Sequence, residues 1–291
     1  MSDAAIEVHG LRKSYGDFEA VRGIDFEVRR GEVFGLLGPN GAGKTTTVEI
    51  LEGYRSRTEG HVSVLGLDPD HRPRGLRARV GIVLQSTGLY RHIKVREALA
   101  HFAAMYPQAR DVDEVIALTG LEGKQDALVR TLSGGQLRRL DLALALVGDP
   151  ELIFLDEPTT GFDPAARRNA WETIRSLGQL GKTVLLTTHY LDEAQALANR
   201  VAIIKDGRIL AEGAPRELGS ANAGATRYRV AYRDGDGTLR EQETADPTTL
   251  LHELTGAALA RGERLEGLTV ARPTLEDVYL ELTADEQVEH G

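Results

Sequence analysis

The segment "GPNGAGKTT", residues 38–46, most constrains the fold of this chain of 291 residues. It follows "VFGLL" at residues 33–37, a continuous apolar run typical of a buried strand in a parallel sheet. It leads into "KTTTVEILEG", whose pattern predicts a helix. A glycine-rich turn between a buried strand and a helix presents backbone N–H groups to an anion. The sequence therefore predicts an α/β domain built around an anion-binding loop.

The residue types of this loop indicate that the anion is a phosphate group. The segment matches G-x-x-x-x-G-K-[ST] with Gly38, Gly43, Lys44 and Thr45. Glycines let the backbone wrap the phosphates, Lys44 reaches the outer phosphates, and the Thr45 hydroxyl is suited to Mg²⁺. A chance glycine loop is the alternative, and the flanking strand and helix make it remote. The predicted phosphate-binding residues are Gly38, Pro39, Asn40, Gly41, Ala42, Gly43, Lys44, Thr45 and Thr46.

Two carboxylates end another apolar run, "LIFLDEP" at residues 152–158. Side chains alternate along a strand, so Asp156 and Glu157 need not share one task. Asp156 is suited to holding Mg²⁺, and Glu157 to polarising an attacking water. Taken alone, a solvated pair of carboxylates is the commoner interpretation. The phosphate loop in the same chain favours the catalytic one.

A second candidate phosphate site lies in "TLSGGQLRRL", residues 131–140. Ser133 can cap a helix, and Gly134 and Gly135 leave its first backbone N–H groups bare, an arrangement that binds anions. The chain thus carries two candidate phosphate sites about ninety residues apart.

These motifs together resemble the ATPase subunit of ATP-binding cassette (ABC) proteins. "LSGGQ" followed by "FLDEP" carries the resemblance, which extends over residues 6 to about 215. Gln85 ends "GIVLQ" as the Q-loop glutamine of that family does, and His189 in "LLTTHYLDEA" matches the switch histidine. Asp163 in "TTGFDP" matches the D-loop, and Tyr15 the aromatic residue that stacks on adenine. Each match is weak alone, and the shared order strengthens them.

The resemblance implies a reason for two phosphate sites. Cassettes of this family stack head to tail, so that the Lys44 loop of one copy faces the Ser133 helix end of the other, with ATP between them. It implies Glu157, His189 and Lys44 as catalytic residues, with ATP and Mg²⁺ as cofactors. Besides the loop residues, the nucleotide would be contacted by Tyr15, Gln85, Ser133, Gly134, Gly135, Gln136 and Asp163. The implied Mg²⁺ ligands are Thr45, Gln85 and Asp156.

The order of the patterns predicts an α/β P-loop ABC ATPase core followed by a small α+β domain. We expect the core at residues 1–220, with a mostly parallel sheet, an antiparallel β subdomain and a helical insert at about 86–150. "LGSANAGAT", residues 218–226, is typical of a linker. Residues 221–291 form the predicted C-terminal domain, which is acidic, with 14 Asp and Glu against 7 Lys and Arg.

The C-terminal "RPTLEDVYLELT" resembles the ending of ATPase subunits from ABC-2-type exporters, which include drug, antibiotic, lipid and polysaccharide export systems. Leu275, Val278, Tyr279 and Leu282 recur at helical spacing. A generic amphipathic helix is the alternative interpretation. The resemblance implies an integral membrane permease of about six spans as partner, beside the second ATPase copy, and drug-like or antibiotic-like cargo.

Composition excludes several other classes. With no cysteine, the chain has neither disulfides nor Cys-ligated zinc. No secretory signal or membrane span is predicted, so we expect a cytoplasmic protein, peripheral on the cytoplasmic face of the cell membrane. Positive charge is not clustered, so no nucleic-acid partner is expected. Lipid, polysaccharide, haem or ion export and a soluble, non-transport ABC ATPase remain alternatives. The resemblance implies that the contacts to the cargo lie in the permease, which is a separate chain.

Overall fold

The computed structural model describes residues 3–83, 88, 90–221, 228–271 and 274–284. The chain divides into two compact units, Met1–Glu212 and Gly213–Gly291. This division lies before the expected boundary at residue 220, because helix α8 (Pro215–Ala221) belongs to the second unit. Residues 218–221, predicted to begin a linker, instead end this helix.

The first unit is built on a six-stranded sheet with the order β5-β6-β7-β3-β8-β9. The five strands from β5 to β8 run parallel, as the alternation of strand and helix patterns predicts. All five residues of β3 are buried, which explains its continuous apolar sequence. The strands are β3 (Val33–Leu37), β5 (Val80–Val83), β6 (Leu152–Asp156), β7 (Thr183–Thr188), β8 (Arg200–Lys205) and β9 (Arg208–Gly213).

A separate antiparallel sheet, in the order β2-β1-β4, contributes the N-terminal strands. Its strands are β1 (Ala4–Tyr15), β2 (Phe18–Arg29) and β4 (Glu59–Val64). The segment "GHVSVLGL", residues 60–67, contributes one strand to this sheet. The chain turns at Leu65 and Gly66, both at positive φ, and only β4 forms there, pairing with β1.

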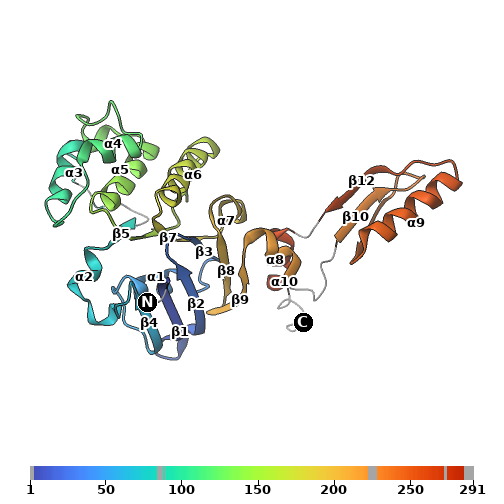
Figure 1. The fold of residues 1–291 in the computed structure, drawn as a ribbon, viewed down its shortest axis with the longest axis horizontal. Coiled ribbons are helices and arrows are strands. Elements are labelled where there is room, and N and C mark those ends of the chain that lie inside the picture. Colours follow the sequence, from blue (N-terminus) through green and yellow to red (C-terminus); the bar gives the residue numbers. More distant parts are fainter. Residues whose placement is uncertain (1–2, 84–87, 89, 222–227, 272–273, 285–291) are drawn as a thin grey trace. The chain divides into compact units, whose positions relative to one another are not determined.

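Helices flank the main sheet, and Figure 1 shows α3, α4 and α5 gathered together beyond β5. They form the expected helical insert around buried side chains that include Val95, Leu99, Val115 and Leu140. The helices of this unit are α1 (Lys44–Leu51), η1 (Pro69–His71), α2 (Arg74–Arg77), α3 (Val95–Ala103), α4 (Val112–Leu118), η2 (Val129–Thr131), α5 (Gly134–Leu146), α6 (Pro164–Gln179) and α7 (Leu191–Leu197).

The second unit contains an antiparallel sheet in the order β11-β10-β12, so its predicted α+β character is what the structure has. Thr274 and Asp277 exchange hydrogen bonds at the start of α10 and so cap this helix. Within the described residues, no helix is both long and apolar enough to cross a membrane. Besides α8, the elements are β10 (Tyr228–Arg233), β11 (Leu239–Thr244), α9 (Pro247–Ala260), β12 (Glu266–Ala271) and α10 (Leu275–Ala284).

Candidate functional site

The phosphate loop runs from the end of β3 to the start of α1 and packs tightly on two neighbouring strands. A Cβ atom at Gly38 would lie 2.1 Å from the backbone oxygen of Ile204. At Gly43, where φ is 104°, it would lie 2.6 Å from the backbone oxygen of Ala20. Glycine is therefore required at both positions for the loop to close on β8 and β2.

Lys44 points back into this loop from the first turn of α1. Its side chain is 4% exposed, and Nζ donates to the carbonyl oxygens of Gly38 at 2.7 Å and Pro39 at 3.0 Å. Nζ also lies 3.8 Å from Oε1 of Glu157. Burial lowers the pKa of Lys44, and the charges of Glu157 and Asp156 oppose that shift. The ammonium group is thus held inside the loop, beside the carboxylates.

A pocket of about 510 Å³ opens over the loop and gathers predicted residues from three elements. It is lined by Tyr15, Phe18, Ala20, Asn40, Gly41, Gly43, Lys44, Thr45, Thr46 and Glu157. Tyr15 is 41% exposed at the tip of the β1–β2 hairpin, which leaves ring surface available for stacking. Sequence reasoning missed Phe18, which is paired with Tyr15 across the turn. The signal in the sequence was the short turn at Gly16 and Asp17, which places Phe18 opposite Tyr15.

One hydroxyl group bonds to both acidic residues at the end of β6, to the carboxylate of Asp156 and to the backbone of Glu157. Thr187 Oγ1 donates to Oδ1 of Asp156 at 2.5 Å and accepts the backbone N–H of Glu157 at 3.0 Å. Burial raises the pKa of Asp156, against the hydrogen bond from Thr187, and the charge of Glu157 raises it further. The carboxylates of Asp156 and Glu157 are therefore close to each other and to Lys44.

Glu52, at the end of α1, belongs to this acidic group and was missed by sequence reasoning. Burial raises its pKa to about 8, and the charges of Asp156 and Glu49 add to the shift. Its position in the sequence, one residue past an apolar helix, carries no signal for this environment. The environment is created when α1 packs near β6.

Glu157 adopts a backbone conformation that is unusual for its residue type. Its φ is 45°, in the left-handed region, and Pro158 follows it. The Thr160 hydroxyl donates to Oε2 at 3.1 Å, and Nδ1 of His189 lies 3.3 Å from Oε1. His189, predicted from a distant part of the sequence, is thus brought beside Glu157. Its Nδ1 has no hydrogen-bond partner within the described residues.

The donor types around the loop are suited to Mg²⁺. Thr45, which lines the pocket, carries a hydroxyl group, and Asp156 at the end of β6 carries carboxylate oxygen atoms. Mg²⁺ prefers oxygen ligands and usually combines one or two protein ligands with water and substrate phosphates. In the part of the chain that the structure describes, no cluster of three or more acidic or histidine residues forms a complete cage. Gln85, predicted as a ligand, lies outside the described residues.

The second candidate phosphate site lies at the start of α5. Ser133 Oγ accepts the N–H of Gln136 at 3.3 Å, and Gln136 Oε1 accepts the N–H of Ser133 at 3.0 Å. The Gln136 side chain therefore closes a capping box. At Gly134 and Gly135 an added Cβ would meet nothing within 4 Å, and neither residue has positive φ. Nothing in the described residues of this chain requires glycine at these two positions.

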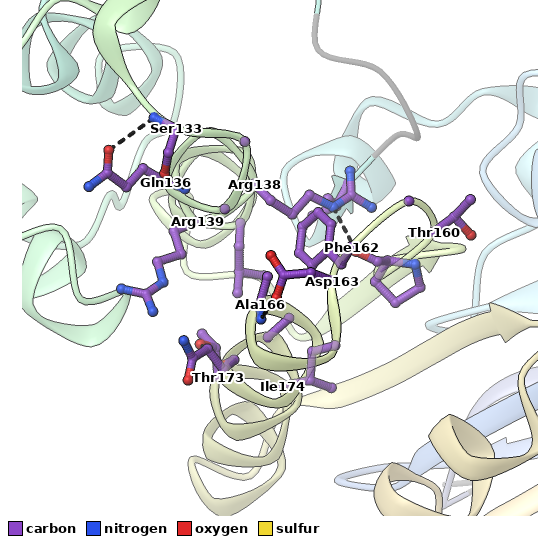
Figure 2. A pocket seen from close by; sticks show the side chains of 18 of the residues that line it. Ser133, Gln136, Arg138, Arg139, Thr160, Phe162, Asp163, Ala166, Thr173 and Ile174 are labelled. Atoms are coloured by element: carbon purple, nitrogen blue, oxygen red, sulfur yellow. Dashed lines mark hydrogen bonds between the residues drawn. The ribbon is translucent and has the colours of Figure 1, made fainter.

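This helix end borders a different pocket, of about 620 Å³, which Figure 2 shows from close by. Ser133, Gly134, Gly135 and Gln136 line it together with Asp163. Asp163 caps α6, because its Oδ1 accepts the N–H groups of Ala165 and Ala166 at 2.9 Å. None of the first four residues lines the pocket at the phosphate loop. Within one chain the two candidate phosphate sites thus lie in separate pockets.

Known proteins are similar to this chain in both fold and sequence. The family model described as ABC transporter matches residues 21–160. The Nod factor export ATP-binding protein I of Paraburkholderia xenovorans (strain LB400) is 42% identical, over 98% of this chain and 99% of its own length. The daunorubicin resistance ATP-binding protein DrrA3 of Streptomyces coeruleorubidus is 39% identical, over 99% of this chain and 98% of its own length.

The chain belongs to the ABC transporter family. Among solved structures, cbiO1 of Clostridium perfringens, described as part of an ABC transporter complex, matches this ABC ATPase with a TM-score of 0.68 and 29% identity, over 76% of this chain and 92% of its own. The bacterial ABC transporter cassette MJ0796, solved as a dimer, matches with a TM-score of 0.63 and 26% identity, over 72% and 99%.

The family resemblance and the fold class expected from the motifs are thereby confirmed. This ABC ATPase binds ATP and hydrolyses it, and it is a subunit of the exporter type.

Proposed function

We propose that this ABC ATPase hydrolyses ATP at sites shared between two copies of the chain. The separation of the two phosphate sites carries the proposal. No contact among the described residues requires glycine at Gly134 or Gly135. Glycine in a helix nevertheless lowers stability. A nucleotide bound to a second copy would approach these backbone N–H groups closely. Such an approach explains why glycine, which has no side chain, stands at both positions. The related cassette MJ0796, solved as a dimer, supports the association of two copies.

In this proposal each copy contributes half of each site. Tyr15 stacks on the adenine, and the loop from Gly38 to Thr46 wraps the phosphates. Glu157 orients the attacking water, and His189, 3.3 Å from it, contacts the γ-phosphate and helps to position that water. Lys44 of one copy and the N–H groups beside Ser133 of the other offset the charge that develops on the phosphate.

Five further predicted residues have supporting roles in the proposed site. Mg²⁺, when bound, neutralises phosphate charge, and Thr45, Asp156 and Gln85 would hold it. The raised pKa of Asp156 reflects burial among acidic groups, which a divalent cation would relieve. Asp163 and Gln136 lie at the proposed contact with the second copy.

The energy of hydrolysis would drive export through a separate membrane protein. Relatives named for Nod factor export and for daunorubicin resistance support a small, drug-like or antibiotic-like cargo. The proposed partner is an integral membrane permease of about six spans, with this ATPase bound at the cytoplasmic face. We propose residues 1–220 as the nucleotide-binding domain, with residues 221–291 as an appended acidic domain.

Mixing two inactive variants tests the shared sites. Lys44→Ala disables the phosphate loop, and Ser133→Arg places a bulky side chain at the other half-site. A mixed dimer contains one site in which both halves are intact, so ATPase activity should reappear on mixing. Each variant alone, at the same total concentration, is the control. Sites contained within one chain would give no more activity than the average of the two variants.

A pull-down tests the transport assignment. Glu157→Gln chains, tagged and held with Mg-ATP, would be recovered from detergent-solubilised membranes of the native host. A polytopic membrane protein recovered in stoichiometric amount is the expected result. Lys44→Ala chains are the matched control for ATP-dependent capture. Recovery of ribosomal or DNA-repair proteins instead would contradict the export function.

A further inference from the structure

The buried carboxylate of Glu193 has no role in the mechanism proposed above. It lies in the first turn of α7 and is 1% exposed. Its Oε1 accepts hydrogen bonds from Thr159 Oγ1 at 2.7 Å and from Trp171 Nε1 at 3.1 Å. Its Oε2 has no hydrogen-bond partner among the described residues. Burying a carboxylate is unfavourable, and the positive charge of Arg138 offsets part of that cost. A carboxylate kept in so buried a place points to a specific task.

The position of Glu193 suggests what that task is. Thr159 follows Glu157 by two residues, and Glu193 follows His189 by four. The hydrogen bond between Thr159 and Glu193 therefore joins the segments that carry Glu157 and His189, whose side chains lie 3.3 Å apart. Trp171 attaches α6 to the same junction.

A second contact connects α6 with the histidine. The guanidinium carbon of Arg167 lies 4.2 Å from the ring centre of Tyr190. The Tyr190 ring in turn lies 4.0 Å, centre to centre, from the ring of His189. Since Asp163 caps α6, both contacts lead from the proposed dimer contact towards the site of hydrolysis.

We propose that Glu193 is a positioning residue that holds His189 and Glu157 at their working separation. It does so by tying α7 to the loop after Glu157 and to α6. If a second copy displaced Asp163, α6 would move with it. The movement would reach Glu193 through Trp171, and His189 through Arg167 and Tyr190. This inference rests on the proposed roles of Glu157 and His189.

Kinetics of substituted chains test this role. Glu193→Ala removes both hydrogen bonds and should lower kcat about tenfold or more, while KM for ATP stays within about twofold, because the phosphate loop is untouched. Glu193→Gln keeps an oxygen that accepts both bonds and should restore most of kcat. Thr159→Val should resemble Glu193→Ala in direction. Thr119→Val, which removes another buried hydroxyl that bonds only to carbonyl oxygens of α4, should change neither constant.

The fluorescence of Trp171 provides a second readout, because it is the only tryptophan in the chain. Its emission should shift in Glu193→Ala but not in Glu193→Gln. The proposal is overturned by normal kcat in Glu193→Ala, by an equal loss in Glu193→Gln, or by a rise in KM that parallels a fall in Tm. Absence of ATPase activity in the unsubstituted chain would instead refute the proposed function itself.

Discussion

At the scale of single residues, Glu157 combines the features expected of a catalytic carboxylate. It sits at φ 45°, a conformation that costs on the order of 1–2 kcal/mol for a residue other than glycine. Its backbone N–H donates to the Thr187 hydroxyl, and its carboxylate accepts a hydrogen bond from the Thr160 hydroxyl. These two bonds hold Glu157 in this conformation. Strain of this kind persists where the surrounding structure enforces it, commonly at functional sites.

Replacing Glu157 with glutamine should separate ATP binding from hydrolysis. The amide keeps the shape of the side chain but cannot act as a general base, so turnover should fall at least about a hundredfold. Equilibrium binding of Mg-ATP should persist, measured by a fluorescent nucleotide. Turnover close to that of the unsubstituted chain would contradict the role of Glu157.

The pKa of Glu52 predicts a pH-dependent stability. The folded chain keeps this proton up to about pH 8, whereas the unfolded chain releases it near the ordinary glutamate pKa of 4.5. Stability due to Glu52 is therefore present below the lower value and is lost as the pH rises through this window. Glu52→Gln, which never ionises, should become more stable relative to the unsubstituted chain, by at most about 1.4 kcal/mol per pH unit.

Thermal unfolding between pH 5 and pH 8.5 measures this effect. The gain in Tm for Glu52→Gln should be small at pH 5 and largest at pH 8.5. The exposed Glu122→Gln substitution serves as the matched control. A gain that is the same at every pH would show that Glu52 is ionised throughout, against the assignment of a raised pKa.

At the scale of elements, glycines of two kinds begin the two helices that would meet a nucleotide. Before α1, Gly38 is required by the chain itself, because Ile204 leaves no space for a side chain. In the first turn of α5, Gly134 and Gly135 are not required by any described contact. Gly38 is thus needed for the chain to fold, whereas a ligand from outside the chain would explain Gly134 and Gly135.

Alanine substitution should therefore affect the two helix starts differently. Gly38→Ala should lower Tm and abolish nucleotide binding, since overpacking typically costs about 1–3 kcal/mol. Gly135→Ala should leave Tm unchanged or slightly higher, because alanine favours the helix, yet reduce ATPase activity. Calorimetry and a phosphate-release assay on both variants test this. A loss of Tm in Gly135→Ala would remove the argument for an external ligand.

At the scale of the whole molecule, one copy holds the two half-sites in separate pockets. Activity should therefore require association of two copies. In dilute solution, ATPase activity should rise with the square of protein concentration and become linear once dimers predominate. Stopped assays over a wide concentration range, with Glu157→Gln as the blank, measure this. Linear activity at every concentration would indicate that a single copy is sufficient.

The sequence alone determined the phosphate loop, the order of the family motifs, the parallel sheet and the α+β character of the C-terminal unit. These depend on local backbone geometry and on short-range periodicity, which neighbouring residues specify. Tyr15, Lys44 and Glu157 were also predicted, and the structure brings them to one pocket.

Only the tertiary structure decided the features that depend on packing between distant segments. It places Phe18 in the pocket over the loop from Gly38 to Thr46, raises the pKa of Glu52 and ends the first unit at Glu212. It also buries Glu193 between Thr159 and Trp171. Burial and hydrogen bonding of this kind arise when elements far apart in sequence meet, because the cost of removing a charge from water depends on what surrounds it in space.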